Sequence, residues 1–354
     1  MLKCCVRLSE VPLHLYQILA GFELLRRSGK IELEIIKLPS GSPHKLPYNM
    51  LEAQCNGHTF IFDMNDGYDN LLKPEENYID FYNSLLKKCD FLYKRSYSAQ
   101  MNFALESPEK VQKTAPNYFT TVKGNPAHFP VPCDPQKEKI KKIIRLLPLS
   151  QYYNGYNLEQ RFRSEALTHS EPAILFMARL WDPKGEYAGQ LTPQKSEERK
   201  EINEMRAKCI RLCRKEFGSR FTGGVALSDY SIRKYPDLVL EKSGVAKKHE
   251  YLKRMKNSDI LVATAGLHQS TGWKFAEYIA ASKAIVSEPL YYESVGDLAD
   301  GKNYLSFTNE FQCCERITEL FDKQRRCSMM CANKVYYDSY MSIEKTVTQA
   351  LQID

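Results

Sequence analysis

Short apolar segments alternate with amphipathic or charged segments along the second half of this chain, and no other feature restricts its fold as strongly. Strands are predicted at 173–178, 221–227, 259–265 and 284–287. The first of these, AILFMA, is apolar throughout, which is typical of a strand buried on both faces of a parallel sheet. Helices are predicted between the strands, at 193–217, 249–256 and 273–282. Strands that alternate with helices in this way predict a doubly wound α/β domain.

The first half shows the same alternation. Strands are expected at 31–38, 58–63 and 91–93, and helices at 13–28 and 77–88. Between 116 and 172 several prolines break the pattern, which indicates the end of one domain followed by a linker. The length of 354 residues agrees with two domains of about 150 residues each. The sequence therefore predicts one α/β domain over 1–165 and a second over 166–330.

The composition is that of a soluble globular protein with a mild positive charge. The hydrophobic share of 43% and the charged share of 26% exclude a disordered or fibrous chain. Lys and Arg number 50 against 43 Asp and Glu, which gives a net charge of +7. This excess suits a protein that handles phosphate-bearing small molecules or lies near anionic lipid. It is too small for a dedicated nucleic-acid binder, so we expect no nucleic-acid partner.

A basic run at 137–145 carries apolar residues at 140, 143 and 144. We interpret it either as an amphipathic helix that touches anionic lipid headgroups or as a solvated surface segment. The apolar stretches of the chain are far shorter than the roughly 20 residues that span a bilayer. Membrane contact, where it occurs, is therefore expected to be peripheral, at the inner face of the membrane.

The eleven cysteines favour a reducing compartment. The chain opens with MLKCCVRLSEVP, which lacks the basic and apolar regions of a secretion signal. We therefore expect a cytoplasmic protein with free thiols. Two cysteine pairs have a spacing of four residues, Cys209 with Cys213 and Cys327 with Cys331. We interpret them as small apolar side chains rather than metal ligands, because no histidine stands near them in sequence.

The most informative segment follows the strand 259–265. The loop 266–272, GLHQSTG, leads there into a helix that begins near Trp273. In a parallel sheet, such a loop is an anion site because free N–H groups and the helix dipole both face the ligand. Glu277 lies about one turn into the helix, where a carboxylate can accept hydrogen bonds from a ribose diol. Three small residues of the loop allow a phosphate to approach the backbone: Ser270, Thr271 and Gly272.

Two cations follow the strand 173–178. The sequence continues RLWDPKG, which places Arg179 and Lys184 just beyond the carboxyl end of this strand. Cations at this position can clamp a diphosphate leaving group and neutralise its developing charge. Taken alone, the pair is better described as two exposed surface cations.

Together the two segments resemble the nucleotide-sugar domain of GT-B glycosyltransferases, and most closely the retaining group called "glycosyl transferases group 1". The resemblance covers roughly residues 171–325. Glu277 matches the second of the family's two glutamates, Gly272 matches its last loop glycine, and the tail 301–304 resembles a segment that follows the donor-side loops. Arg179 and Lys184 match the pair that clamps the phosphates in that family.

This resemblance implies two Rossmann-like domains facing a cleft, with the donor bound by 166–330 and the acceptor by 1–165. It also implies transfer of a sugar from a nucleoside diphosphate to an acceptor hydroxyl, with retention and with no metal or other cofactor. The final helix, 331–354, is expected to cross back to the first domain, as in that family, or to pack on its own domain.

The chain departs from the family at two positions. Gln269 replaces the first glutamate, which contacts the transferred sugar, and Ala178 replaces a glycine. Gln269 can still hydrogen-bond a hydroxyl but carries no charge. By the resemblance, Arg179, Lys184 and Gln269 form the catalytic set. Donor-binding residues are then expected at His268, Ser270, Thr271, Gly272, Trp273 and Glu277.

The acceptor side is expected on loops that follow strands of the first domain. Asp63 and Asp66 follow one strand, and Lys94 and Arg95 follow another. We prefer an acceptor-side or structural role for the two aspartates, because their Asp-x-x-Asp spacing differs from the Asp-x-Asp of metal-binding transferases. His128, in the proline-rich sequence GNPAHFP, is a candidate base or a structural residue.

Three functions remain open from the sequence. The leading hypothesis is a glycosyltransferase of surface polysaccharide or glycoconjugate synthesis, with a glycan or lipid-linked acceptor. The alternatives are a sugar-nucleotide epimerase of GT-B-like fold and a non-catalytic nucleotide- or sugar-binding relative, the latter because of Gln269 and Ala178. The sugar, the nucleotide base, the acceptor and the oligomeric state are not encoded in these motifs.

Overall fold

Two separate β-sheets organise the chain. The computed structural model describes residues 1–39, 41–42, 45–72, 76–125, 157–185, 191–240 and 248–353. The chain divides into unit 1, made of Met1–Arg161, Tyr292–Gly296 and Asp338–Asp354, and unit 2, made of Phe162–Tyr291 and Asp297–Tyr337. The basic run 137–145 and His128 lie outside the described residues.

The sheet of unit 1 has the strand order β2-β1-β3-β4-β5-β6. Every strand runs parallel to the others except β3, which is antiparallel to both of its neighbours. The strands are β1 (Leu2–Leu8), β2 (Ile31–Lys37), β3 (Met50–Cys55), β4 (His58–Asp63), β5 (Phe91–Lys94) and β6 (Val111–Lys113).

An Asn-Gly turn explains the antiparallel strand. Asn56 and Gly57 connect β3 to β4, and both have positive φ angles, 52° and 80°. These values fit the tight hairpin turns that Asn-Gly pairs favour. The sequence pattern predicted β4 but not β1 or β3, although the Asn-Gly pair was a signal for this hairpin.

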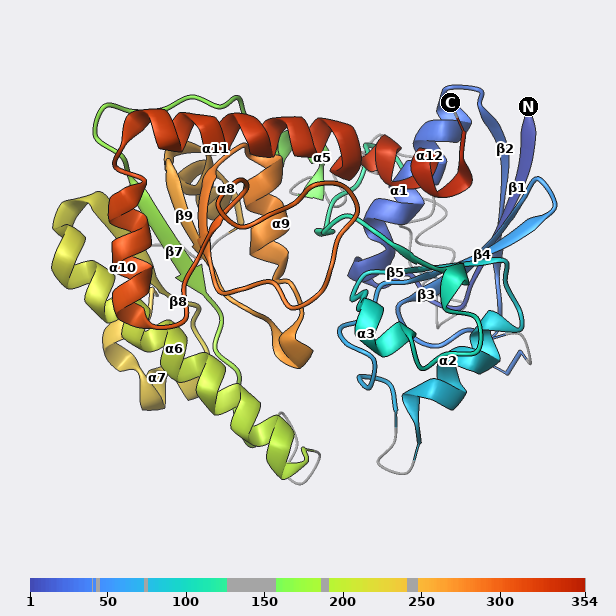
Figure 1. Cartoon of the computed structure of the whole chain (residues 1–354), viewed down its shortest axis with the longest axis horizontal. Helices are drawn as coiled ribbons and strands as arrows, with labels where there is room; N and C mark the ends of the chain where they lie inside the picture. The colour runs from blue at the N-terminus through green and yellow to red at the C-terminus, as the bar shows by residue number, and fades with distance from the viewer. Residues whose placement is uncertain are drawn as a thin grey trace, which may run out of the picture. The chain divides into compact units, whose positions relative to one another are not determined.

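In unit 1, a helix near the start of the chain packs against a helix near its end. The helices α1 (Tyr16–Arg27) and α12 (Ile343–Leu351) lie side by side (Figure 1). Their close approach requires a glycine, because a Cβ at Gly21 would lie 2.3 Å from Cγ2 of Val347. Among the described residues, the remaining helical elements of this unit are η1 (Leu13–Leu15), α2 (Tyr78–Leu86), α3 (Ala99–Asn102), η2 (Pro108–Lys110), most of α5 (Glu159–Phe162) and most of a π-helical turn (Tyr337–Met341).

The sheet of unit 2 is parallel throughout, with the order β11-β10-β9-β7-β8. The strands are β7 (Ile174–Ala178), β8 (Phe221–Val225), β9 (Ile260–Ala263), β10 (Ala284–Ser287) and β11 (Leu305–Ser306). The chain first adds β8 on one side of β7 and then returns to add β9 on the other side. This reversal makes the carboxyl ends of β7 and β9 a topological switch point, the position where open α/β sheets bind ligands.

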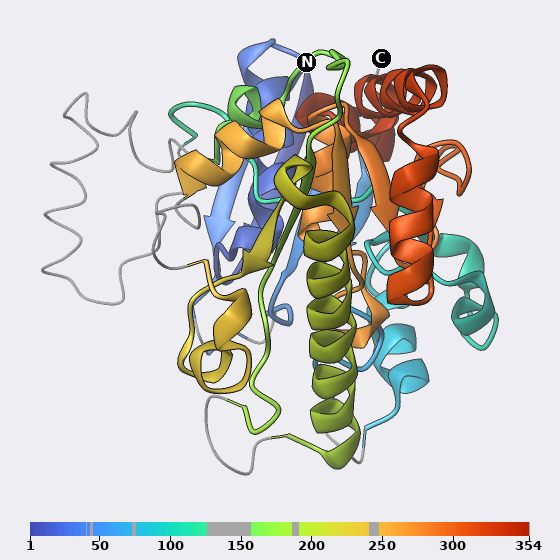
Figure 2. The same ribbon diagram turned by 90° about the vertical axis from the view of Figure 1, so that its left-hand side faces the viewer.

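The long helix α6 (Pro193–Phe217), in the foreground of Figure 2, packs against β8 and α10. Its ends are marked by Thr192, whose hydroxyl accepts a hydrogen bond from the N–H of Lys195, and by Gly218, whose φ angle is 51°. The other helical elements described in unit 2 are η6 (Gly218–Arg220), α7 (Asp229–Lys234), η7 (Pro236–Leu238), α8 (Lys248–Asn257), η9 (Leu267–Gln269), α9 (Trp273–Ala280), α10 (Glu310–Glu319) and α11 (Lys323–Tyr336).

The predicted fold class, α/β with mostly parallel sheets, is confirmed in both units. The predicted domain boundary lies at 165, and the units divide between Arg161 and Phe162. Two features had no signal in the sequence pattern: the return of Tyr292–Gly296 to unit 1, and the start of the C-terminal part of that unit at Asp338 rather than at 331.

The cysteines differ from the expectation of free thiols at one pair. Cys4 and Cys55 face each other across the antiparallel strands β1 and β3 and form a disulfide. Cys209 and Cys213 are buried in unit 2, as predicted, and Sγ of Cys213 lies 3.8 Å from Sγ of Cys314. Among the described residues, no group of three or more His, Cys, Asp or Glu side chains is arranged to hold a metal ion.

No helix in the described part of the chain is both long and apolar enough to cross a membrane.

Candidate functional site

The switch point of unit 2 carries the two segments that the sequence analysis singled out. Arg179 follows β7 directly and is exposed, with its guanidinium carbon 4.7 Å from the centre of the Trp181 ring. Lys184 is also exposed and lies in a turn in which its N–H donates to the Asp182 carboxylate at 2.9 Å. The turn therefore presents both cations beyond the carboxyl end of β7.

The loop 266–272 follows β9, the neighbour of β7. Two hydrogen bonds fold it back on itself, from the N–H of Gly266 to the carbonyl of Ser270 at 2.8 Å, and from the N–H of Ser270 to the carbonyl of Leu267 at 3.2 Å. Ser270 is buried as a result, whereas Gln269 is exposed.

Two consecutive residues of this loop have a left-handed backbone. The φ angles of His268 and Gln269 are 58° and 56°. This region costs residues other than glycine about 1–2 kcal/mol, and such strain clusters at ligand-binding sites. The N–H of His268 donates to the carboxylate of Glu198 on α6 at 2.5 Å, which holds the strained segment in place.

Gly272 occupies the N-cap position of α9. A Cβ at this position would lie 2.8 Å from the carbonyl oxygen of Thr264, so only glycine fits here without a shift of the backbone. Glycine has no side chain to accept hydrogen bonds from the first turn of the helix. The helix start, flanked by the half-buried Thr271 and Trp273, therefore suits an anion.

Arg206, which the sequence analysis did not select, joins the ends of the two strands. It is buried on α6, and its guanidinium donates to the carbonyl of Arg179 at 2.5 Å, to the hydroxyl of Thr264 at 2.8 Å and to the carbonyl of Ala265 at 2.8 Å. Burial lowers the pKa of Arg206 to about 10, which leaves it charged at neutral pH. The sequence offered a signal for its burial but not for its partners, because Arg206 shares the buried stripe of α6 with Ala207, Ile210 and Cys213.

Glu288 is a second residue that the sequence analysis missed. It follows β10, and its carboxylate accepts a hydrogen bond from the N–H of Ala265 at 2.8 Å. Burial raises the pKa of this carboxyl, while the Ala265 bond and the charge of Arg206 oppose the rise. Arg206 and Glu288 thus fix the carboxyl end of β9 from two sides. A charged residue directly after the buried strand 284–287 was the available signal.

Glu277 is buried on α9, and its carboxylate already has two partners. The ammonium of Lys248 donates to one oxygen at 2.8 Å, and the hydroxyl of Tyr251 donates to the other. Lys274, one turn earlier, has its ammonium 3.8 Å from the centre of the Tyr251 ring, and burial lowers its pKa to about 8. The Glu277 carboxylate is therefore surrounded by lysine ammonium groups and a tyrosine hydroxyl. Its contact with a ribose stays a prediction.

In unit 1 the structure pairs the predicted acceptor-side residues with one another. Lys94 donates to the Asp63 carboxylate at 2.8 Å, and both side chains are fully buried. Arg95 forms an ion pair with Asp66, and the arginine side chain is buried. The two ion pairs thus bring together the loops that follow β4 and β5. Because the side chains of Asp63 and Lys94 are fully buried, neither has any surface to offer a ligand. The structural role that we considered for Asp63 accounts for this arrangement.

The chain is similar to several solved structures, but no family model and no curated protein matches it. One similar structure is the C-terminal domain of a glycosyl transferase group 1 family protein (LpcC) from Francisella tularensis. It has 12% identity and a TM-score of 0.33, and the match covers 51% of this chain and 96% of that one.

Two further structures match larger parts of the chain. A mutant of S. aureus TarM in complex with Fondaparinux, alpha-GlcNAc-glycerol and UDP has 12% identity and a TM-score of 0.42, over 81% of this chain and 49% of that one. Anabaena HepE in complex with UDP and glucose has 10% identity and a TM-score of 0.34, over 99% and 100% of the two chains. The match to TarM therefore covers about half the length of that protein. With TM-scores below 0.5, these likenesses carry no argument about the activity of this chain.

Proposed function

We propose that this chain is a glycosyltransferase that moves a sugar from a nucleoside diphosphate to an acceptor hydroxyl, with the donor bound at the switch point of unit 2. The observation that carries the proposal is the placement of Arg179 and Lys184 at the end of β7 beside the loop 266–272 at the end of β9. Cations, a strained loop and an uncapped helix start meet there at the edge of the sheet where ligands bind.

The chemistry follows from where charge develops. As the bond between the sugar and the diphosphate breaks, negative charge grows on the leaving phosphate. Arg179, Lys184 and the first N–H groups of α9 stabilise that charge without reorganising, because Arg206 and Glu288 hold the strand ends in place. We propose that this work is done without a metal ion, in accordance with the resemblance described above.

The loop residues are assigned to the sugar. The exposed amide of Gln269 offers both a donor and an acceptor to a sugar hydroxyl, and His268 stands beside it. Gln269 carries no charge, so it orients the sugar but supplies no electrostatic stabilisation to an oxocarbenium-like centre. Retention of the anomeric configuration is proposed from the family pattern.

Glu277 is assigned to the ribose. Each carboxylate oxygen has more than one lone pair, so the bonds from Lys248 and Tyr251 leave capacity for a ribose hydroxyl. These two partners fix the carboxylate in one orientation before a ligand arrives.

The acceptor is proposed to be a glycan or a lipid-linked sugar that meets unit 1, and the pathway to be surface polysaccharide or glycoconjugate synthesis. A cytoplasmic location with peripheral membrane contact through 137–145 belongs to the same proposal. None of these assignments involves nucleic acid.

Binding of nucleoside diphosphates tests the donor site. The purified chain is titrated with UDP, GDP, ADP and CDP by calorimetry, and at least one is expected to bind. Arg179→Ala and Lys184→Ala are expected to weaken that binding about tenfold or more each, because each removes a charge-assisted contact. Matched controls are Arg220→Ala, before the amino end of β8, and Lys208→Ala, exposed on α6. No binding of any of the four diphosphates would overturn the proposal.

Product analysis separates the transferase from the two alternatives. Each nucleotide sugar that matches the bound diphosphate is incubated with the chain, with and without candidate glycan acceptors, in EDTA. A transferase releases nucleotide and extends the acceptor. An epimerase changes the sugar without an acceptor, and a binding protein changes neither. Activity that disappears in EDTA and returns with a divalent cation would contradict metal independence.

A further inference from the structure

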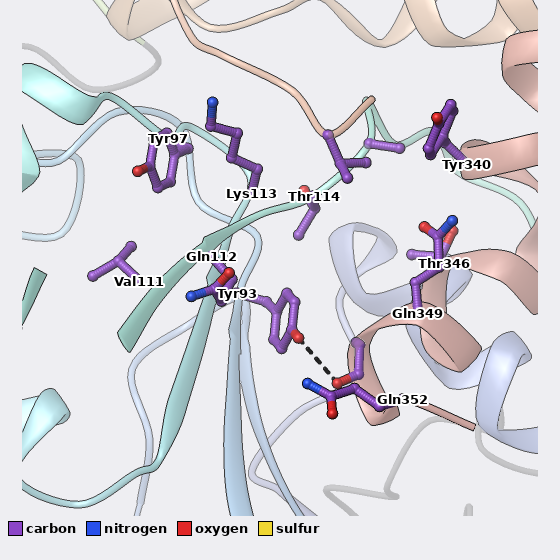
Figure 3. Close-up of a pocket in the computed structure, with 13 residues that line it drawn as sticks. Tyr93, Tyr97, Val111, Gln112, Lys113, Thr114, Tyr340, Thr346, Gln349 and Gln352 are labelled. Atoms are coloured by element: carbon purple, nitrogen blue, oxygen red, sulfur yellow. Dashed lines mark hydrogen bonds between the residues drawn. The ribbon is translucent and has the colours of Figure 1, made fainter. Parts of the chain in front are cut away.

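A pocket in unit 1 is not used by the proposed donor chemistry. It has a volume of about 480 Å³ and is formed by β5, β6, α12 and the segments around Val295 and Tyr340 (Figure 3). All of its lining residues belong to unit 1. None of the residues expected on the acceptor side from the sequence lines it: Asp63, Asp66, Lys94 and Arg95.

The walls of this pocket are polar but carry almost no net charge. Among the described residues that line it, Lys113 is the one charged side chain, and its ammonium lies 2.5 Å from the carboxylate of Glu293, which neutralises it. The other polar side chains are three phenols, three amides and two hydroxyls: Tyr93, Tyr97, Tyr340, Gln112, Gln349, Gln352, Thr114 and Thr346. In a chain of net charge +7, a pocket of this size without a net charge does not select an anion.

Hydrogen bonds within the protein fix the orientation of several of these side chains. The amide nitrogen of Gln349 donates to the carbonyl of Ser339 at 2.9 Å, and that of Gln112 donates to the carbonyl of Glu109 at 2.7 Å. These bonds fix the orientation of each amide and leave its oxygen as an acceptor. The hydroxyl of Tyr93 donates to the carbonyl of Ala350 at 3.0 Å, which sets the plane of that ring (Figure 3).

One polar group in the wall of the pocket lacks a partner, and one glycine shapes that wall. Thr114 is only 6% exposed, and its hydroxyl has no hydrogen-bond partner among the described residues. A buried hydroxyl without a partner costs about 1–3 kcal/mol, so proteins rarely leave one. Gly296 lets the Tyr340 ring pack against its backbone, because a Cβ there would lie 2.7 Å from that ring.

From this chemistry we infer that the pocket binds an uncharged saccharide of one or two rings. The volume lies in the range of about 300–1,000 Å³ that is usual for small-molecule sites. Polar groups surround the space on several sides, with Gln112, Tyr93 and Gln352 along one part and Tyr340, Thr346 and Gln349 along another (Figure 3). A sugar carries hydroxyls around its whole edge and an apolar C–H face that stacks on phenol rings, whereas a nucleobase has polar atoms on part of its edge only.

The inference does not depend on the proposed function, because a chain without transferase activity can still hold a sugar in unit 1. Where both hold, the pocket anchors part of a glycan while the reaction takes place elsewhere.

Saturation-transfer NMR on the full chain tests the pocket without nucleotide. The probes are the methyl glycosides of glucose, galactose, mannose and N-acetylglucosamine, together with maltose, cellobiose and lactose. Glucuronate and glucose 1-phosphate serve as charged counterparts. At least one neutral probe is expected to receive saturation, and its affinity is expected to exceed that of the charged counterparts.

The double variant Gln349→Ala, Gln352→Gly removes two polar groups at low risk to the fold. Alanine favours the helix at 349, and glycine suits the left-handed backbone of Gln352, whose φ angle is 52°. Affinity for the neutral probe is expected to fall about tenfold, for two lost hydrogen bonds. Gln324→Ala, exposed on α11, is the matched control and is expected to leave affinity unchanged.

Absence of saturation in every neutral probe, preference for the charged probes, or an affinity that the double variant leaves unchanged would each overturn the inference. Because no nucleotide is present, these outcomes are independent of the diphosphate titration.

Discussion

The ammonium of Lys94 lies 2.8 Å from the Asp63 carboxylate, and neither side chain is exposed to solvent. All three ammonium protons are used, since Lys94 also donates to the carbonyl of Gly67 at 2.8 Å and to the hydroxyl of Tyr82 at 2.7 Å. The ammonium additionally lies 4.3 Å from the centre of the Tyr68 ring. Burial lowers the pKa of Lys94, and the charge of Asp63 opposes this shift. The pair joins the ends of β4 and β5.

Removing one partner of this pair is expected to destabilise the chain strongly. Lys94→Met leaves a buried carboxylate without its cation, which costs about 3–5 kcal/mol of the free energy of unfolding. The double variant Lys94→Met, Asp63→Asn is expected to recover part of the loss, because it removes both charges. Urea unfolding of the wild type, of Lys94→Met, of Asp63→Asn and of the double variant measures the coupling free energy between the two charges. Simple additivity of the two single losses would contradict a mutual dependence of the two charges.

The free energy of unfolding is expected to depend on pH through Lys283. This lysine of unit 2 is buried, and its ammonium donates to the carbonyl of Lys256 at 2.5 Å. Burial lowers its pKa to about 8 from the ordinary 10.5, with Asp259 opposing the shift and Lys256 adding to it. Between these two values the unfolded state binds more protons than the folded state, so this residue makes stability rise with pH. Below about pH 8 both states are protonated and the contribution is constant.

Urea unfolding of the wild type and of Lys283→Met at about pH 7.5, 8.5 and 9.5 isolates this contribution. The stability of the wild type relative to the variant is expected to increase with pH, by at most about 1.4 kcal/mol per pH unit. A difference that stays constant or decreases would show that the folded chain does not hold Lys283 at a lowered pKa.

Much of the fold could be predicted because local signals agreed with the packing. The helix α6 was predicted with the bounds that the structure has, since Thr192, Pro193 and Gly218 mark its start and end by their own chemistry. β7 was predicted because a parallel strand buried on both faces is apolar throughout. β3 was missed because its residues, MLEAQC, show no clear alternation and only the following Asn-Gly turn marks it.

The candidate site could be predicted only where its residues follow strands. Arg179, Lys184 and Gly272 were selected from their position after a strand or before a helix. Arg206 was not, because its role depends on partners at Thr264 and Ala265, more than fifty residues away in the sequence. The same reason hid the contact of Glu277 with Lys248 and the disulfide between Cys4 and Cys55, each of which pairs residues of different elements.

Gly21 is predicted to be essential for the packing of α1 on α12. A Cβ there would lie 2.3 Å from Cγ2 of Val347 and 2.8 Å from the carbonyl oxygen of Ile343. Gly21→Ala is therefore expected to lower the free energy of unfolding by about 1–3 kcal/mol, in spite of the better helix propensity of alanine. Adding Val347→Ala should relieve the side-chain contact and recover part of the loss. An increase in stability of the single variant, measured by urea unfolding, would contradict the close approach.

Reduction of the disulfide is expected to destabilise unit 1. Cys4 and Cys55 are separated by 51 residues, and closing a loop of that size constrains the unfolded chain by about 4 kcal/mol in the entropic model. The urea midpoint is expected to fall on addition of dithiothreitol, and Cys4→Ala should lie at the lower value in both conditions. Mass spectrometry after alkylation checks the bond directly. Identical midpoints with and without reductant would instead agree with the free thiols expected from the sequence.

Arg206 provides the sharpest test of how the candidate site is built, because one side chain supplies donors to the ends of two strands. Arg206→Met removes hydrogen bonds to Arg179, Thr264 and Ala265 at once and leaves three partly buried acceptors without this donor. The expected loss is about 3 kcal/mol or more of the free energy of unfolding. Arg206→Lys keeps the charge, but its three donors share one nitrogen, whereas the guanidinium reaches Thr264, Arg179 and Ala265 from three separate nitrogens. The lysine variant should therefore lie between the wild type and the methionine variant.

The exposed Lys208 on the same helix is the control, and Lys208→Met should change stability by less than about 0.5 kcal/mol. Adding Glu288→Gln to Arg206→Met should recover part of the loss, because the neutral amide still accepts from the N–H of Ala265 and no longer requires the charge of Arg206. An Arg206→Met chain as stable as the Lys208→Met control would mean that the ends of β7 and β9 hold their positions without the guanidinium. In that case the phosphate clamp that we propose would depend on the loop 266–272 alone for its rigidity.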